Sequence, residues 1–177
     1  RGVRHIVLGI GGSATCDAGV GMLEALKSHR CLSGNSSKEV LPQPLNRCRR
    51  HRLTDIDDID QPTSTRSILT VACDVDNPLY GEEGAAYVFA PQKGANSEQV
   101  KFLDERLKAF AKETEEQGMA TPEDAFHPGA GAAGGLGYAL LTYLGAELKP
   151  GVDVVLDACG FDDVLKGGDV VITGEGC

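Results

Sequence analysis

Glycine gathers in three short stretches of this sequence where the backbone could come close to a ligand. Residues 9–15 read GIGGSAT, residues 129–135 read GAGAAGG, and Gly174 and Gly176 flank Glu175. Glycine lets the main chain approach a bound group, and free amides at the start of a helix favour an anion. Ser13 and Thr15 add hydroxyl groups to the first stretch. One such loop often serves only a tight turn, but three in one short chain predict a site for a small anion.

Three carboxylates and a lysine stand close to these stretches or to the strand ends. Asp17 follows the first stretch, Asp74 ends an apolar run, and Glu175 lies within the third. Beside a bound phosphate, a carboxylate would hold Mg²⁺ or accept a hydroxyl proton, and Lys93 would neutralise negative charge. The structural alternatives stay open at this point. An acid in the first turn of a helix interacts favourably with the helix dipole, and a lysine among turn formers is commonly just solvated.

The common nucleotide-binding motifs fit this sequence poorly. No G-x-x-x-x-G-K-[ST] loop occurs. Residues 9–14 fit a loose form of G-x-G-x-x-G after a predicted strand, but no second strand ending in an acid follows soon after. Residues 129–134 fit the glycine spacing, but no strand is predicted before them. A nicotinamide-dependent oxidoreductase therefore remains only an alternative.

The composition is that of an ordinary globular protein, with 41% hydrophobic and 24% charged residues. A net charge of −9 and the lack of a basic stripe argue against a nucleic acid partner. The sequence has no run of about 18 apolar residues, so no membrane span is predicted. The six cysteines show no metal-binding spacing. They predict reduced thiols and a cytoplasmic location.

Hydrophobic periodicity predicts the elements that would position these residues. Apolar, β-branched runs predict strands over 3–10, 67–74 and 169–173. Helices are predicted over 17–27, from a capping box at Asn96 onward, and from the second glycine stretch to Gly145. Residues 28–66 have no sustained period and are interpreted as an irregular segment. The alternation predicts an α/β fold with a mainly parallel sheet and flanking helices, whose ligand lies beyond the carboxyl ends of the strands.

Four blocks of sequence together resemble the class I glycerate kinase family. They are, in order, IVLGIGGSATCDAGVGMLEAL, VACDVDNPLYGEEGAAYVFAPQKGA, PGAGAAGGLGYAL with LGAELKPGVDVVL, and DVVITGEG. The resemblance implies transfer of a phosphoryl group from ATP to D-glycerate, giving phosphoglycerate, with Mg²⁺ as the metal. It also implies that the chain is part of a longer, two-domain α/β enzyme.

The same resemblance implies which residues would line the cleft between the two domains. Catalytic roles would fall to Asp17, Asp74 and Lys93, with Asp17 or Asp74 as base or Mg²⁺ ligand. Binding of substrate or nucleotide would fall to Gly11, Gly12, Ser13, Thr15, Asn77, Gly129, Gly131, Gly134, Gly135 and Glu175.

The chain departs from the family pattern at several places. Cys16 and Ala18 stand where Asn and Gly are usual around Asp17, and Ala90 stands where Gly is usual. Residues 1–177 are interpreted as an incomplete kinase core truncated at both ends, in which residues 28–66 match poorly. Three alternatives remain: an inactive fragment that only binds small anions or nucleotide, an active kinase whose missing elements come from another chain, and a non-catalytic α/β ligand-binding module.

Overall fold

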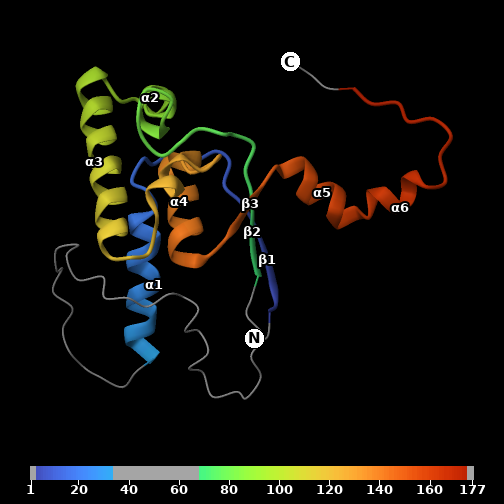
Figure 1. The fold of residues 1–177 in the computed structure, drawn as a ribbon, viewed down its shortest axis with the longest axis horizontal. Helices are drawn as coiled ribbons and strands as arrows, with labels where there is room; N and C mark the ends of the chain where they lie inside the picture. Colours follow the sequence, from blue (N-terminus) through green and yellow to red (C-terminus); the bar gives the residue numbers. More distant parts are fainter. Residues whose placement is uncertain (1–2, 34–67, 175–177) are drawn as a thin grey trace.

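A small parallel sheet organises the fold. The computed structural model describes residues 3–33 and 68–174, and Figure 1 shows their arrangement. The three strands lie in the order β1 (His5–Gly9), β2 (Ile68–Ala72) and β3 (Glu147–Lys149). Both strand pairs are parallel, so the three carboxyl ends lie at one edge of the sheet. The predicted α/β fold with a parallel sheet and flanking helices is confirmed.

Most of the helices lie together on one side of the sheet, whereas the last two lead away from it (Figure 1). The α-helices are α1 (Val20–Ser33), α2 (Ala85–Phe89), α3 (Ser97–Glu116), α4 (Ala132–Leu144), α5 (Gly151–Cys159) and α6 (Phe161–Leu165). Two 3-10 turns, η3 (Pro91–Lys93) and η4 (Pro122–Phe126), precede α3 and α4. Of the helices that the structure describes, none combines the length and apolar character needed to cross a bilayer.

The start of α3 confirms a prediction made from local sequence alone. The Asn96 side chain accepts a hydrogen bond from the Gln99 amide at 2.9 Å, and the Gln99 side chain accepts one from the Asn96 amide at 2.9 Å. This reciprocal capping box satisfies two donors that the first turn would otherwise leave open. The apolar stripe that follows is buried at Val100 and Leu107, as its spacing predicts.

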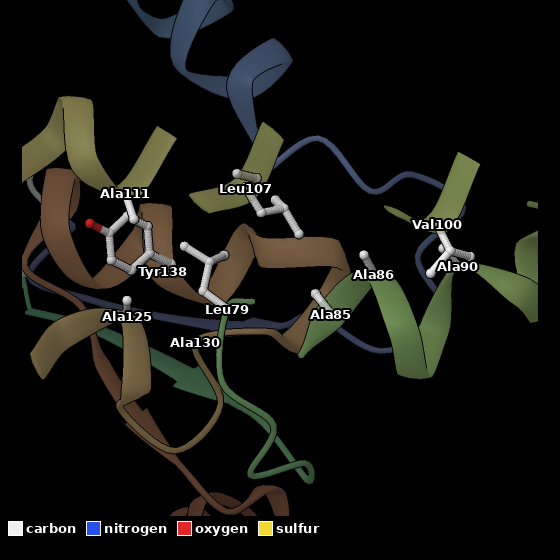
Figure 2. Close-up of a cluster of buried hydrophobic side chains, with 11 residues drawn as sticks. Leu79, Ala85, Ala86, Ala90, Val100, Leu107, Ala111, Ala125, Ala130 and Tyr138 are labelled. Carbon is white, nitrogen blue, oxygen red and sulfur yellow. The ribbon is translucent and has the colours of Figure 1, made fainter. Parts of the chain in front are cut away.

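The main core joins α2, α3 and α4 through small side chains. Figure 2 shows three larger side chains turned toward one another: Tyr138 of α4, Leu107 of α3, and Leu79 from the connection between β2 and α2. Around them, alanine side chains let the elements approach closely, namely Ala85, Ala86, Ala90, Ala111, Ala125 and Ala130. A second cluster, containing Val71 of β2 and Leu140 of α4, attaches these helices to the sheet. The strand ends are therefore held rigidly against the start of α4.

The prediction of a strand over residues 169–173 is wrong, because the structure forms no strand there. The apolar side chains of this segment are open to solvent, with Ile172 94% exposed. A strand forms only where a neighbour completes its backbone hydrogen bonds. Among the described residues no strand lies beside it, although its sequence is β-prone.

Other boundaries also differ from the prediction. The first helix begins at Val20, three residues after Asp17, and continues to Ser33, so the start of the segment predicted to be irregular is helical. Residues 34–66 lie outside the described residues. The apolar run over 86–90 forms α2, and β3, α5 and α6 were not predicted.

Ala18 has a backbone conformation that favours glycine. Ala18 is buried and has a φ of 53°, in the left-handed region that favours glycine. We expect Ala18→Gly to raise the free energy of unfolding by about 0.5–1 kcal/mol, because relief of this strain exceeds the added entropy of the unfolded chain. Urea unfolding would measure it, with Ala14→Gly as control, since Ala14 has no positive φ. Equal effects of the two changes would contradict the strain argument.

Candidate functional site

A pocket of about 230 Å³ lies at the carboxyl ends of β1 and β2. Four segments that are distant in sequence form its walls. They are residues 10–13 after β1, residues 72–75 at the end of β2, Phe89, Gln92 and Lys93 from α2 and η3, and Ala132 and Ala133 at the start of α4. This is the edge of a parallel sheet where α/β proteins place their ligands. Of the predicted site residues, it brings together Gly11, Gly12, Ser13, Asp74 and Lys93.

Lys93 is bonded to the loop that follows β1. Its Nζ donates to Ser13 Oγ at 2.8 Å and to the Thr15 carbonyl oxygen at 2.6 Å. Thr15, a predicted binding residue, does not line the pocket. Its contact with the site is the bond from its backbone oxygen to Lys93. An ammonium group has three donors, and these two bonds leave one for a ligand. Lys93 is thus a partly buried cation at the wall of the pocket.

Asp74 supplies the carboxylate among the pocket-lining residues. Its Oδ1 accepts a hydrogen bond of 2.7 Å from the amide of Gly151, the first residue of α5. The carboxylate therefore caps this helix, whose own N-cap residue, Pro150, offers no side-chain acceptor. The side chain is exposed and lines the pocket, and Oδ2 accepts no hydrogen bond from the described residues.

Asp17 has a different position and an evident local role. Its two carboxylate oxygens accept from the amides of Gly19 at 3.2 Å and Gly21 at 3.4 Å, at the start of α1. It does not line the pocket. The capping interpretation of this acid, left open by the sequence, is the one that its described contacts support.

The glycines of residues 129–135 bring backbones into contact and do not line the pocket. A Cβ at Gly131 would lie 2.2 Å from the Pro78 carbonyl oxygen, and one at Gly134 would lie 2.2 Å from that of Thr15. Gly129 and Gly135 are similarly enclosed. These residues allow the loops that surround the pocket to pack without side chains between them.

Asn77, another predicted site residue, does not line the pocket. The Asn77 side chain donates to the Glu83 carbonyl oxygen at 2.8 Å. The backbone carbonyl oxygen of Asn77 accepts from the Gly131 amide at 2.8 Å. Asn77 thus fixes the turn after β2. Glu175 lies outside the described residues.

Sequence reasoning did not single out the other residues that line the pocket, namely Ile10, Ala72, Cys73, Val75, Phe89, Gln92, Ala132 and Ala133. The signal that could have found Cys73 and Val75 is their place beside Asp74 at the strand end. Gln92 precedes Lys93 in η3. Ala133, with a φ of 54°, and the two glycines after it form a left-handed turn at the start of α4, which the sequence pattern does not reveal.

Burial raises the pKa of the Cys73 thiol, and the neighbouring Asp74 and Asp76 add to this. A raised pKa leaves less thiolate at a given pH, and the thiolate is the reactive form. We therefore expect iodoacetamide at pH 8 to alkylate Cys73 at least about fivefold more slowly than the exposed Cys159. Peptide mass spectrometry after timed quenching measures both rates. Equal rates would contradict the assigned burial.

Comparison with known proteins decides the family. A family model described as the glycerate kinase family matches residues 1–177, which is the whole chain. The chain belongs to the glycerate kinase family. The resemblance inferred from the four sequence blocks is thereby confirmed.

Several relatives support membership of the glycerate kinase family. A glycerate kinase of Bacillus subtilis (strain 168) is 46% identical over 176 residues, and a glycerate 2-kinase of Escherichia coli (strain K12) is 40% identical over 175 residues. Each alignment covers 99% of this chain and 44% of the relative. A solved structure described as a glycerate kinase 2 of Salmonella typhimurium LT2 is 37% identical, with a TM-score of 0.70, over 99% of this chain and 46% of its own. The chain thus spans a little under half the length of these glycerate kinases.

Proposed function

We propose that this chain carries the pocket in which a glycerate kinase transfers the terminal phosphoryl group of ATP to D-glycerate. A glycerate hydroxyl oxygen forms a bond to the γ-phosphorus, the bond from that phosphorus to the β–γ bridging oxygen breaks, and ADP leaves. The hydroxyl proton passes to a carboxylate or to solvent. The observation that carries this proposal is the convergence of the Gly11–Gly12–Ser13 backbone, Lys93 and Asp74 on one pocket in a member of this family.

The residues of the pocket suit a negatively charged ligand. The exposed backbone at Gly11 and Gly12 has no side chain to keep a phosphate or carboxylate away, and an added Cβ at either would meet nothing within 4 Å. The Lys93 ammonium places positive charge at the wall, in a protein whose net charge is −9. Phosphoryl transfer depends mainly on positioning and on such charge stabilisation.

Magnesium would have to be shared between Asp74 and the nucleotide. Among the residues that the structure describes, no three His, Cys, Asp or Glu side chains come together to hold a metal. Mg²⁺ commonly takes one or two carboxylates and completes its shell with phosphate oxygens and waters. Asp74 fits that requirement, since it lines the pocket with one oxygen uncommitted. When bound, the metal would neutralise charge on the phosphates.

A coupled assay of ADP release tests the proposed function directly. Mg-ATP and D-glycerate are supplied together, with tartronate and lactate as control acids. ADP release only with D-glycerate supports the proposal, whereas equal release with lactate would contradict selection of this substrate.

A second candidate, binding without turnover, is favoured by one observation: the chain spans 44% of the length of the relatives from B. subtilis and E. coli. In this case the pocket holds phosphate or nucleotide but residues needed for turnover lie elsewhere in the longer proteins. Calorimetric titration with Mg-ATP and with inorganic phosphate separates the two candidates. Measurable binding with no ADP release, in a folded sample, supports this second candidate over the first.

A further inference from the structure

The loop after β1 is open on the side where its glycines lie. An added Cβ at Gly9, Gly11 or Gly12 would meet no atom within 4 Å, and Gly12 has a φ of 71° that leaves other residues strained. Ile10 is buried in the second cluster, but Gly11 and Gly12 add no side-chain packing of their own to the loop. Its far end is tied down at Ala18, whose amide donates to the Gly134 carbonyl oxygen at 3.0 Å.

Lys93 bonds to the stretch between these two points. Among the described residues, its side chain is the one that hydrogen bonds to Ser13 Oγ and to the Thr15 carbonyl, at 2.8 and 2.6 Å. The two contacts join residues that are 80 and 78 positions apart in the sequence. Hydrogen bonds from a charged donor are about twice as strong as neutral ones.

The backbone that carries Lys93 is itself firmly placed. The Lys93 amide donates to the Ala90 carbonyl oxygen at 3.0 Å, and Ala90 is buried in the main core. Gly94 then ends the turn with a φ of 95°, and its amide donates to the Pro91 carbonyl oxygen at 3.0 Å. The lysine thus extends from a short turn fixed to the core toward the exposed part of the loop, at Ala14 and Thr15.

We infer that Lys93 is a positioning residue, which holds the loop after β1 through the Ser13 hydroxyl and the Thr15 backbone carbonyl before any ligand enters. The loop amides are then already arranged for an anion, and the third donor of Lys93 stays available to it. The consequence for turnover rests on the proposed function, but the effect on the ligand-free protein does not. This separates Lys93 from a cation that only meets the ligand.

The test measures the thermal midpoint of the ligand-free protein. Lys93→Met should lower it by about 4–8 °C, because two charge-assisted bonds are lost. Lys101→Met is the matched control, since it removes the same charge from an exposed position on α3, and it should shift the midpoint by no more than about 1 °C. Lys93→Arg keeps charge and donors and should recover part of the loss. Ser13→Ala should lower the midpoint by about 2 °C alone and by much less in the Lys93→Met background.

An unchanged midpoint in Lys93→Met, together with weaker binding of inorganic phosphate, would overturn the inference, because the lysine would then act on the ligand only. Fully additive effects of Ser13→Ala and Lys93→Met would overturn it as well. If Lys93→Met does not fold, the Ser13→Ala shift decides: about 2 °C supports the inference, and no shift overturns it. None of these outcomes depends on ADP release, so failure of the proposed function would be seen separately.

Discussion

Replacing Asp74 by Asn should lower the rate of ADP release by about 10²–10⁴-fold while leaving the thermal midpoint nearly unchanged. Asn keeps an oxygen that can accept from the Gly151 amide, so the cap of α5 is retained. What it removes is the negative charge at the pocket wall. On the proposed function, Mg²⁺ would then lose a carboxylate partner, or the hydroxyl proton would lose its acceptor. The measurement is the coupled assay on both proteins, with unfolding followed in parallel.

Two neighbouring acids provide controls for this change. Asp76→Asn alters an exposed acid two residues away that does not line the pocket, and it should leave the rate within about twofold. Asp17→Asn should also keep most of the rate, because an Asn can still accept from the Gly19 amide. Titrating Mg²⁺ separates the two roles of Asp74: a variant rescued by high Mg²⁺ has lost a metal ligand, and one that is not has lost a base. A larger loss at Asp17 than at Asp74 would move the reaction away from this pocket.

Adding a single methyl group at Gly131 should destabilise the protein strongly. A Cβ there would lie 2.2 Å from the Pro78 carbonyl oxygen and 3.0 Å from that of Asn77, both of them backbone atoms. Its φ of −77° suits any residue, so the effect is purely one of space. Relief requires the turn after β2 to move away from α4, and we expect Gly131→Ala to cost about 3 kcal/mol in the free energy of unfolding. Urea denaturation followed by circular dichroism would measure it.

Gly9→Ala is the matched control for Gly131→Ala. Gly9 also lacks a positive φ, and an added Cβ would meet nothing within 4 Å. Its change should alter the free energy of unfolding by less than about 0.5 kcal/mol. If the two alanine variants were equally stable, the close approach of the two backbones at Gly131 would be refuted.

Local sequence predicted the elements whose signals are themselves local. The capping box at Asn96 and Gln99, the end of α4 at Gly145, and the apolar runs of β1 and β2 were all read correctly because neighbouring residues determine them. β3 was missed since it has only three residues, and its pairing partner β2 is more than 70 positions away. The wrong strand over 169–173 has the opposite cause: its residues are β-prone, but pairing depends on a neighbour that local sequence does not specify.

For the site, the sequence predicted the edge of the sheet but not the role of each residue there. Asp74 and Gly11 follow strands, and parallel strands bring their ends together. Glycine type alone does not separate Gly11, which borders the pocket, from Gly134, which makes room for another backbone. Only the fold shows that the Thr15 backbone lies against Gly134, which gives that glycine a packing role. Asp17 and Asp74 likewise look alike in sequence, and only their distant neighbours differ.

The carboxylate of Asp74 belongs to two structures at once, since it holds the first amide of α5 and also faces the pocket. A ligand or metal that drew the Asp74 carboxylate into the pocket would weaken the bond between Oδ1 and the Gly151 amide. Binding of the occupant and formation of the start of α5 are then coupled. If the occupant weakens α5 by a given factor, a change that weakens α5 would raise the affinity for the occupant by the same factor. A change in α5 would thereby reach the sheet edge through the hydrogen bond between Gly151 and Asp74.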